Sequence, residues 1–135
     1  MSNITNVVKQ ERNMTILNRG VLASGLDQIL SGAGPFTLFA PSDFAFGKLE
    51  TGILDTLLKP ENKLKLADLL TYHVVAGRLS FKDLKDGDKL KTLNGQELSV
   101  SIKDNKVSID GATIQNRDVP TSNGVIHSLD SVLKN

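Results

Sequence analysis

A change in hydrophobic period near residue 88 constrains the fold more than any other feature of this sequence. Before that point, apolar residues recur at three- and four-residue spacing, which is typical of helices with one buried face. After it, Leu98, Val100 and Ile102 alternate with polar residues, and Val107 and Ile109 continue the alternation. A period of two is typical of strands with one buried face. The sequence therefore predicts a helical first half, an antiparallel strand-rich second half and an α+β fold.

Short turns divide the second half. Asn94-Gly95, Asp104-Asn105 and Asp110-Gly111 each lie between alternating segments. Asn, Asp and Gly tolerate the positive φ angles that tight hairpin turns require. We therefore expect an antiparallel meander, followed by a final strand over residues 124–129.

The first half contains helical stripes and one buried strand. The stripes are Ile4, Val7 and Val8; Leu17, Val21 and Leu22; Leu26, Ile29 and Leu30; Ile53, Leu54, Leu57 and Leu58; Leu66, Ala67, Leu69 and Leu70. Residues 31–35, with two glycines and a proline, interrupt this pattern, and residues 36–40 form an apolar run that predicts a buried strand. Ser42 is expected to cap a helix over residues 43–46, and residues 80–84 to form one capped helical turn.

Composition excludes several classes of protein. The 135 residues suit a single domain, expected over 1–135, and 39% hydrophobic residues argue against disorder. A formal net charge of +1 gives no reason to expect nucleic acid as a partner. With no cysteine and two histidines, thiolate metal sites are excluded and few metal ligands remain. No apolar stretch approaches the ~20 residues of a transmembrane helix.

Three segments resemble the motifs of the fasciclin domain family, in the family's order. They are residues 37–46 (TLFAPSDFAF), 69–77 (LLTYHVVAG) and 123–133 (NGVIHSLDSVL). The resemblance implies a β-sheet wedge with several α-helices packed along one side. It also implies a binding module without catalysis or cofactor, in cell adhesion, extracellular matrix or the bacterial envelope. Its expected partner is a cell-surface protein receptor or a polysaccharide.

The resemblance also implies candidate partner-binding residues. In matrix homologues a Tyr-His segment and an Asp-Ile pair are linked to integrin recognition, and these match Tyr72-His73 and Asp118-Val119. In strand geometry Tyr72 and His73 would face opposite sides, which predicts that one is buried and the other more exposed. The alternative is structural: sheet interior for Tyr72-His73, and for Asp118 a carboxylate that caps the turn over residues 120–124.

Ser42, Asp43, Asn123, Gly124 and His127 are expected to be structural residues of the motifs. His127 lies in an apolar strand, so its ring needs a hydrogen-bond partner, and Ser42 or Asp43 is a candidate. A metal-binding or pH-sensing His127 is the alternative, but no second ligand lies near it in the sequence.

An enzyme is not expected. Ser42, Asp43 and His127 could form a hydrolase triad, but no Gly-x-Ser-x-Gly turn and no nucleotide-binding loop is present. We expect no catalytic residues, no cofactor and no metal.

The alternative function is a soluble glycan- or small-molecule-binding domain inside the cell. If a leader was removed, the protein is expected to be secreted, periplasmic or at the cell surface; if Met1 is the native start, it is expected in the cytoplasm. We expect a monomer or weak self-association.

Overall fold

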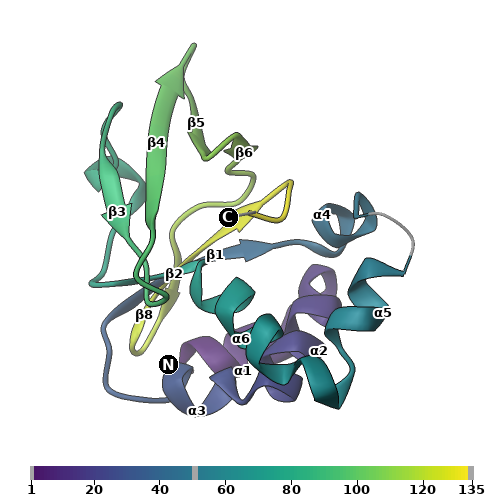
Figure 1. Cartoon of the computed structure of the whole chain (residues 1–135). Helices are drawn as coiled ribbons and strands as arrows, with labels where there is room; N and C mark the ends of the chain where they lie inside the picture. The colour runs from purple at the N-terminus through teal and green to yellow at the C-terminus, as the bar shows by residue number, and fades with distance from the viewer. Residues whose placement is uncertain (1, 50–51, 134–135) are drawn as a thin grey trace.

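A computed structural model describes residues 2–49 and 52–133. Met1, on which the expected compartment depends, lies outside these residues. Within the described residues, the strands form two four-stranded sheets. The α-helices gather on one side of the first sheet and the second sheet rises on the other (Figure 1). The fold is α+β, with helices first and most strands later, as the sequence predicts.

The first sheet has the strand order β2-β1-β8-β7. Its centre is β1 (Phe36–Pro41), which pairs in parallel with β8 (Gly124–Leu129). The edges are β2 (Val74–Ala76) and β7 (Val119–Thr121), each antiparallel to its neighbour. The expectation of a turn over residues 120–124 is wrong in part. Residues 119–121 pair with β8, and the turn is confined to residues 122–123.

The second sheet is the expected meander. Its strands are β3 (Lys89–Lys91), β4 (Glu97–Lys103), β5 (Lys106–Ile109) and β6 (Ala112–Thr113). The turn between β4 and β5 has φ of 53° at Asp104 and 65° at Asn105, as tight hairpins require. Bridges at Val75–Thr92 and Ile114–Leu129 join the two sheets.

Short helices cover the first sheet. The α-helices are α1 (Ile4–Gln10), α2 (Thr15–Ser24), α3 (Leu26–Leu30), α4 (Asp43–Gly47), α5 (Ile53–Leu57) and α6 (Lys63–Thr71), and the 3-10 helices are η1 (Arg12–Met14), η2 (Pro60–Asn62) and η3 (Phe81–Asp83). Two predicted caps are confirmed. Ser42 accepts a hydrogen bond from the Ala45 N–H at the start of α4, and Ser80 caps η3, its N–H and hydroxyl both donating to the Asp83 carboxylate. Leu22 and Ile29, placed on buried stripes by their spacing, are 55% and 48% exposed instead.

The first sheet separates two hydrophobic clusters. Leu38 and Ala40 of β1 pack in the cluster beneath the helices, whereas Phe39 packs in the cluster shared with the second sheet. Successive side chains of a strand point to opposite faces, so a strand covered on both sides is buried along its whole length. This explains why β1 after Phe36 and all of β8 are buried, with their polar residues Thr37, His127 and Ser128 hydrogen-bonded.

Candidate functional site

Tyr72 and His73 lie between the end of α6 and the start of β2, and both are buried (4% and 0% exposed). The prediction that one of them is exposed is wrong. The two residues form the turn after α6 rather than part of a strand, so the alternation of strand side chains does not apply to them.

His73 connects three parts of the chain. Its Nδ1–H donates to the Leu69 carbonyl (2.8 Å), and its Nε2 accepts from the Leu133 N–H (2.9 Å). Its own carbonyl accepts from the Phe39 N–H (2.8 Å). Burial lowers the pKa of His73 to about 4, so the ring is neutral near pH 7.

Tyr72 connects the first sheet to the second. Its hydroxyl donates to one carboxylate oxygen of Asp110 (2.7 Å), and the other oxygen accepts from the Ser99 N–H (2.8 Å). Burial raises the pKa of Tyr72 to about 12, and the Asp110 carboxylate adds to the shift because it disfavours a phenolate beside it.

His127 is a buried structural histidine, but its expected partners were wrong. Its Nε2–H donates to the Leu79 carbonyl (2.7 Å) and its Nδ1 accepts from the Asp118 N–H (3.2 Å), so neither Ser42 nor Asp43 holds it. The ring also stacks on Phe39 at 5.7 Å between centroids. Burial lowers the pKa of His127.

Ser42 and Asp43 connect α4 to other segments. The Ser42 hydroxyl donates to the Leu129 carbonyl (3.2 Å). The Asp43 carboxylate accepts from the Ile16 N–H (2.9 Å) and the Thr15 hydroxyl (2.7 Å) at the start of α2. Among the described residues no hydrogen bond joins Ser42 or Asp43 to His127, so the structure does not bring the three residues of an imagined hydrolase triad together.

Asn123 and Gly124 fix the entry into β8. The Asn123 amide accepts from the Ile4 N–H (3.0 Å) and donates to the carbonyls of Leu30 (2.6 Å) and Gly32 (2.9 Å). A Cβ atom at Gly124 would lie 2.0 Å from the Phe36 carbonyl oxygen, so only glycine fits there. The polar residues of all three motifs therefore bond distant backbone segments together.

Asp118 and Val119 differ from the other candidates. Asp118 is exposed, whereas Val119 is half-buried against the cluster beneath the helices. The Asp118 carboxylate accepts from the Phe81 N–H (2.7 Å) instead of capping the turn over residues 120–124. Asp118 thus holds η3 against the loop before β7.

An exposed surface surrounds Asp118. The Arg117 guanidinium lies 4.2 Å from the centre of the Phe81 ring, which is a cation–π contact. A cavity of about 280 Å³ beside them is lined by Phe81, Lys106, Ile114 and Arg117, among others. We call Phe81, Lys106, Arg117 and Asp118 the Arg117 surface. Sequence reasoning missed Phe81 and Arg117 because no pattern links residues 36 positions apart.

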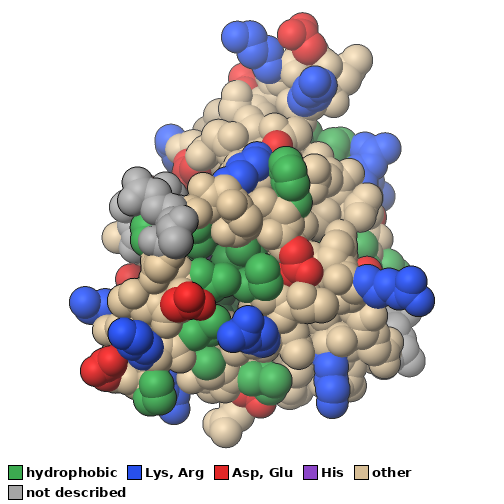
Figure 2. All heavy atoms as spheres, turned by 90° about the vertical axis from the view of Figure 1, so that its right-hand side faces the viewer, with side chains coloured by type: hydrophobic (Ala, Val, Ile, Leu, Met, Phe, Trp, Pro, Cys, Tyr) green, Lys and Arg blue, Asp and Glu red, His purple; other side chains and the backbone are tan. Residues whose placement is uncertain are grey.

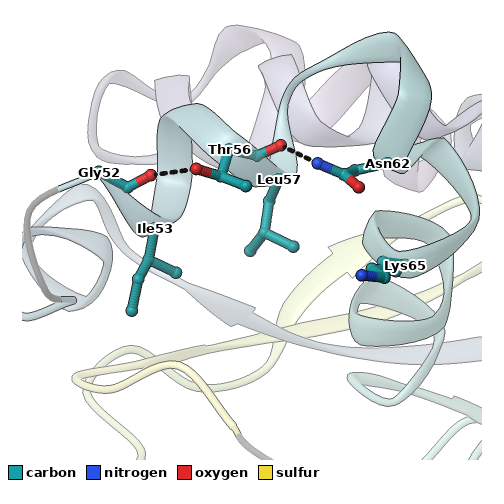
Figure 3. A pocket seen from close by; sticks show the side chains of 6 residues that line it. All are labelled: Gly52, Ile53, Thr56, Leu57, Asn62 and Lys65. Carbon is teal, nitrogen blue, oxygen red and sulfur yellow. Dashed lines mark hydrogen bonds between the residues drawn. The ribbon is translucent and has the colours of Figure 1, made fainter.

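A second exposed feature is a groove beside α5. One end is a cavity of about 460 Å³ lined by Gly52, Ile53, Thr56, Leu57, Asn62 and Lys65 (Figure 3). The other is a cavity of about 320 Å³ lined by Leu49, Ile53, Leu57, Leu69 and Val132. Ile53 and Leu57 line both cavities, and we call the two together the α5 groove. Figure 2 shows hydrophobic side chains gathered on this face, with charged ones around them.

The described part of the chain contains neither a cluster of metal ligands nor a membrane-spanning helix. No group of three or more His, Asp or Glu side chains in residues 2–49 and 52–133 is arranged to hold a metal ion. Over the same residues, no helix has both the length and the apolar character needed to cross a membrane.

Comparison with known proteins agrees with the fold. The Fasciclin domain family model matches residues 12–135. Protein sll1483 of Synechocystis sp. is 42% identical over 130 residues, which cover 96% of this chain and 72% of that protein. Transforming growth factor-beta-induced protein ig-h3 of Sus scrofa is 35% identical over 133 residues, which cover 98% of this chain and 19% of that protein. The structure of a FAS1 domain pair from the insect cell adhesion molecule Fasciclin I has a TM-score of 0.89 at 18% identity, covering 99% of this chain and 51% of that one.

Proposed function

The chain belongs to the fasciclin domain family, and on that premise we propose that it is a non-catalytic binding module that mediates cell adhesion or attachment to a cell surface or extracellular matrix. Fasciclin I, which shares the fold, is a cell adhesion molecule. In this role the chain acts outside the cytoplasm, in the periplasm, at the cell surface or in secreted form.

One observation carries the proposal: the polar motif side chains are used to hold the fold. His73, His127 and Asn123 are buried, and each bonds backbone groups of distant segments. Catalysis requires such groups to reach a substrate, whereas a binding module requires only a stable surface. This distribution supports a binding role.

We assign partner contact to the Arg117 surface. Arginine and aromatic side chains are enriched at protein interfaces, and the exposed Asp118 carboxylate supplies a charge of opposite sign beside them. We assign no partner contact to Tyr72, His73 or Val119, because Tyr72 and His73 are buried and Val119 packs against the cluster beneath the helices. A cell-surface protein receptor or a polysaccharide is the proposed partner.

Attachment of cells to immobilised protein tests the proposal. Arg117→Gln removes the cation above Phe81. Asp118→Asn removes the charge but keeps an acceptor for the Phe81 N–H, and asparagine tolerates the φ of 56° at this position. We expect either change to weaken attachment roughly tenfold, equivalent to about 1.4 kcal/mol.

Arg19→Gln is the matched control, because Arg19 is an exposed arginine on α2. It is expected to leave attachment unchanged. Wild-type protein that binds no cell, matrix or polysaccharide preparation would contradict an adhesion role. Attachment that survives both Arg117→Gln and Asp118→Asn would show that another surface makes the contact.

The α5 groove favours a second candidate, a small-molecule-binding domain. Its two cavities, of about 460 and 320 Å³, fall in the size range of small-molecule sites. A thermal-shift screen against sugars and metabolites tests it, and a melting temperature that no ligand raises would count against it.

A further inference from the structure

We propose that the α5 groove binds a single-chain anionic amphiphile of the fatty-acid type, with its hydrocarbon chain along the apolar end and its carboxylate at Lys65. This inference names a ligand class for the second candidate function and does not depend on the adhesion role.

The apolar end of the groove suits a hydrocarbon chain. The described residues that line it are all aliphatic: Leu49, Ile53, Leu57, Leu69 and Val132. Burial of each CH₂ group against such a surface is favourable, so binding strengthens with the number of CH₂ groups in the chain. Leu49, Leu57 and Val132 are half-buried against the cluster beneath the helices and Ile53 is exposed, so a ligand can reach the outer side of this lining.

The other end of the groove carries one charge. Lys65 is the only charged residue among the described residues that line either cavity. Lys65 lies on α6 and Leu57 on α5, and both line the same cavity (Figure 3). The lining therefore has an apolar stretch next to a single cation, which is the complement of an anionic head group on an apolar chain.

The remaining polar groups hold the rim of this end in shape. The Thr56 hydroxyl donates to the Gly52 carbonyl (2.7 Å), and the Asn62 amide donates to the Thr56 carbonyl (2.7 Å) (Figure 3). The Asn62 amide nitrogen carries a second hydrogen, so it can donate to a carboxylate beside Lys65.

A sugar fits the α5 groove less well. Sugars expose many hydroxyl groups, and each one gives up hydrogen bonds to water on binding. This loss costs free energy unless the site offers a hydrogen-bond partner in return. Among the described residues, the aliphatic end offers no side-chain partner and the lining contains no aromatic ring. The groove therefore favours an amphiphile over a glycan.

The test compares two probes that differ only in the head group, decanoate and decanol, by calorimetry at concentrations below micelle formation. We expect decanoate to bind wild-type protein more tightly than decanol. Lys65→Met keeps the length of the side chain but removes the charge. It should weaken decanoate binding about fivefold, the upper end for an exposed charge pair, and leave decanol binding unchanged.

Lys63→Met is the matched control, because the Lys63 side chain reaches toward Gly25, at the turn between α2 and α3. It should change neither affinity. Equal binding of decanoate and decanol, or equal loss in the Lys63 and Lys65 variants, would overturn the assignment of the head group.

A second pair of variants tests the apolar end. Ile53→Glu places a carboxylate in the wall that both cavities share, at a residue exposed enough (38%) to tolerate the change. It should abolish binding of both probes, whereas Leu64→Glu, at an 85% exposed position that lines neither cavity, should not. Decanoate binding that survives Ile53→Glu would overturn the proposal. Sugars that raise the melting temperature while decanoate does not would overturn it and leave the second candidate function standing.

Discussion

The ring of His73 accepts a hydrogen bond from the backbone N–H of Leu133, with 2.9 Å between the two nitrogens. The other ring nitrogen donates to the Leu69 carbonyl, so the bond to Leu133 requires the neutral tautomer. A proton added to Nε2 would replace the acceptor by a second donor facing the Leu133 N–H. The hydrogen bond from Leu133 to His73 is thus formed only while the His73 ring is neutral.

Stability should fall in mild acid. The pKa of His73 is lowered from 6.5 to about 4, so between these values the unfolded chain binds a proton that the folded chain does not. The contribution of His73 to the free energy of unfolding is fully present above pH 6.5. It is lost as the pH falls toward 4, with a slope of up to about 1.4 kcal/mol per pH unit. The pKa of His127 is lowered too and adds to this slope. Urea unfolding at pH 7.5, 6 and 5 measures the slope.

His73→Asn separates the contribution of His73, because asparagine does not titrate. The variant should be less stable than wild type at pH 7.5 and should lose stability less steeply on acidification. A free energy of unfolding that is constant from pH 7.5 to 5 in the wild type would contradict the buried neutral state of both rings.

The phenol of Tyr72 should ionise at a pH about two units higher than that of an exposed tyrosine. The chain has one tyrosine, so absorbance at alkaline pH reports this group alone, and we expect a midpoint near 12 instead of 10. Because the pKa is raised on folding, the contribution of Tyr72 to the free energy of unfolding is fully present below pH 10. It is lost as the pH rises toward 12. Asp110→Asn should move the midpoint down but leave it above 10, since burial remains. A midpoint at 10 in the folded wild type would show that the ring is solvated.

The contact between Tyr72 and Asp110 should also be measurable near neutral pH. Tyr72→Phe keeps the ring in the core and removes only the hydroxyl that donates to the carboxylate. We expect a loss of about 1 kcal/mol in the free energy of unfolding. An unchanged urea midpoint would indicate that water replaces the lost hydrogen bond without cost.

Gly124→Ala should destabilise the protein severely. The new Cβ would lie 2.0 Å from the Phe36 carbonyl oxygen, where β8 approaches β1, so the central strand pair must separate. We expect a loss of about 3 kcal/mol or more. Gly47→Ala at the end of α4 is the control: no atom lies within 4 Å of its Cβ, and stability should rise slightly or stay constant. Similar melting temperatures for the two variants would contradict the close approach at Gly124.

Asn123→Ala should cost about 3 kcal/mol. The change leaves the Ile4 N–H and the carbonyls of Leu30 and Gly32 without their partner. Asn123→Asp should also destabilise, because the added oxygen cannot donate to the two carbonyls. Asn116→Ala is the control, since that exposed residue bonds Ser128 only through its backbone. Equal unfolding midpoints for Asn123→Ala and Asn116→Ala would contradict the bracing role of Asn123.

Local structure was predictable because its causes are local. The meander follows from period-two alternation and from turn residues that accept positive φ, and the cap at Ser42 follows from its position before α4. The exposure of Leu22 and Ile29 was not predictable, because a stripe along one helix does not reveal where the neighbouring helices end. The burial of Tyr72 and His73 was predicted only in part. The sequence pattern suggested a strand, whose side chains alternate, whereas the two residues form the turn after α6.

The proposed binding surfaces could be identified only from the tertiary structure. Arg117 lies over Phe81, and Lys65 and Leu57 line one cavity, only because the fold places their segments side by side. No sequence pattern within one segment predicts its contact with the other.

Sequence by itself determined the class of fold, its order of helices and strands and the motifs that carry family membership, because hydrophobic period, turn residues and caps act within a few positions of the chain. Only the tertiary structure decided that β1 pairs in parallel with β8, that His127 bonds Leu79 and Asp118 rather than Ser42, and that His73 holds Leu133. These contacts join residues that are distant along the chain. They are selected by how the two hydrophobic clusters pack on either side of the first sheet, which depends on the whole chain at once.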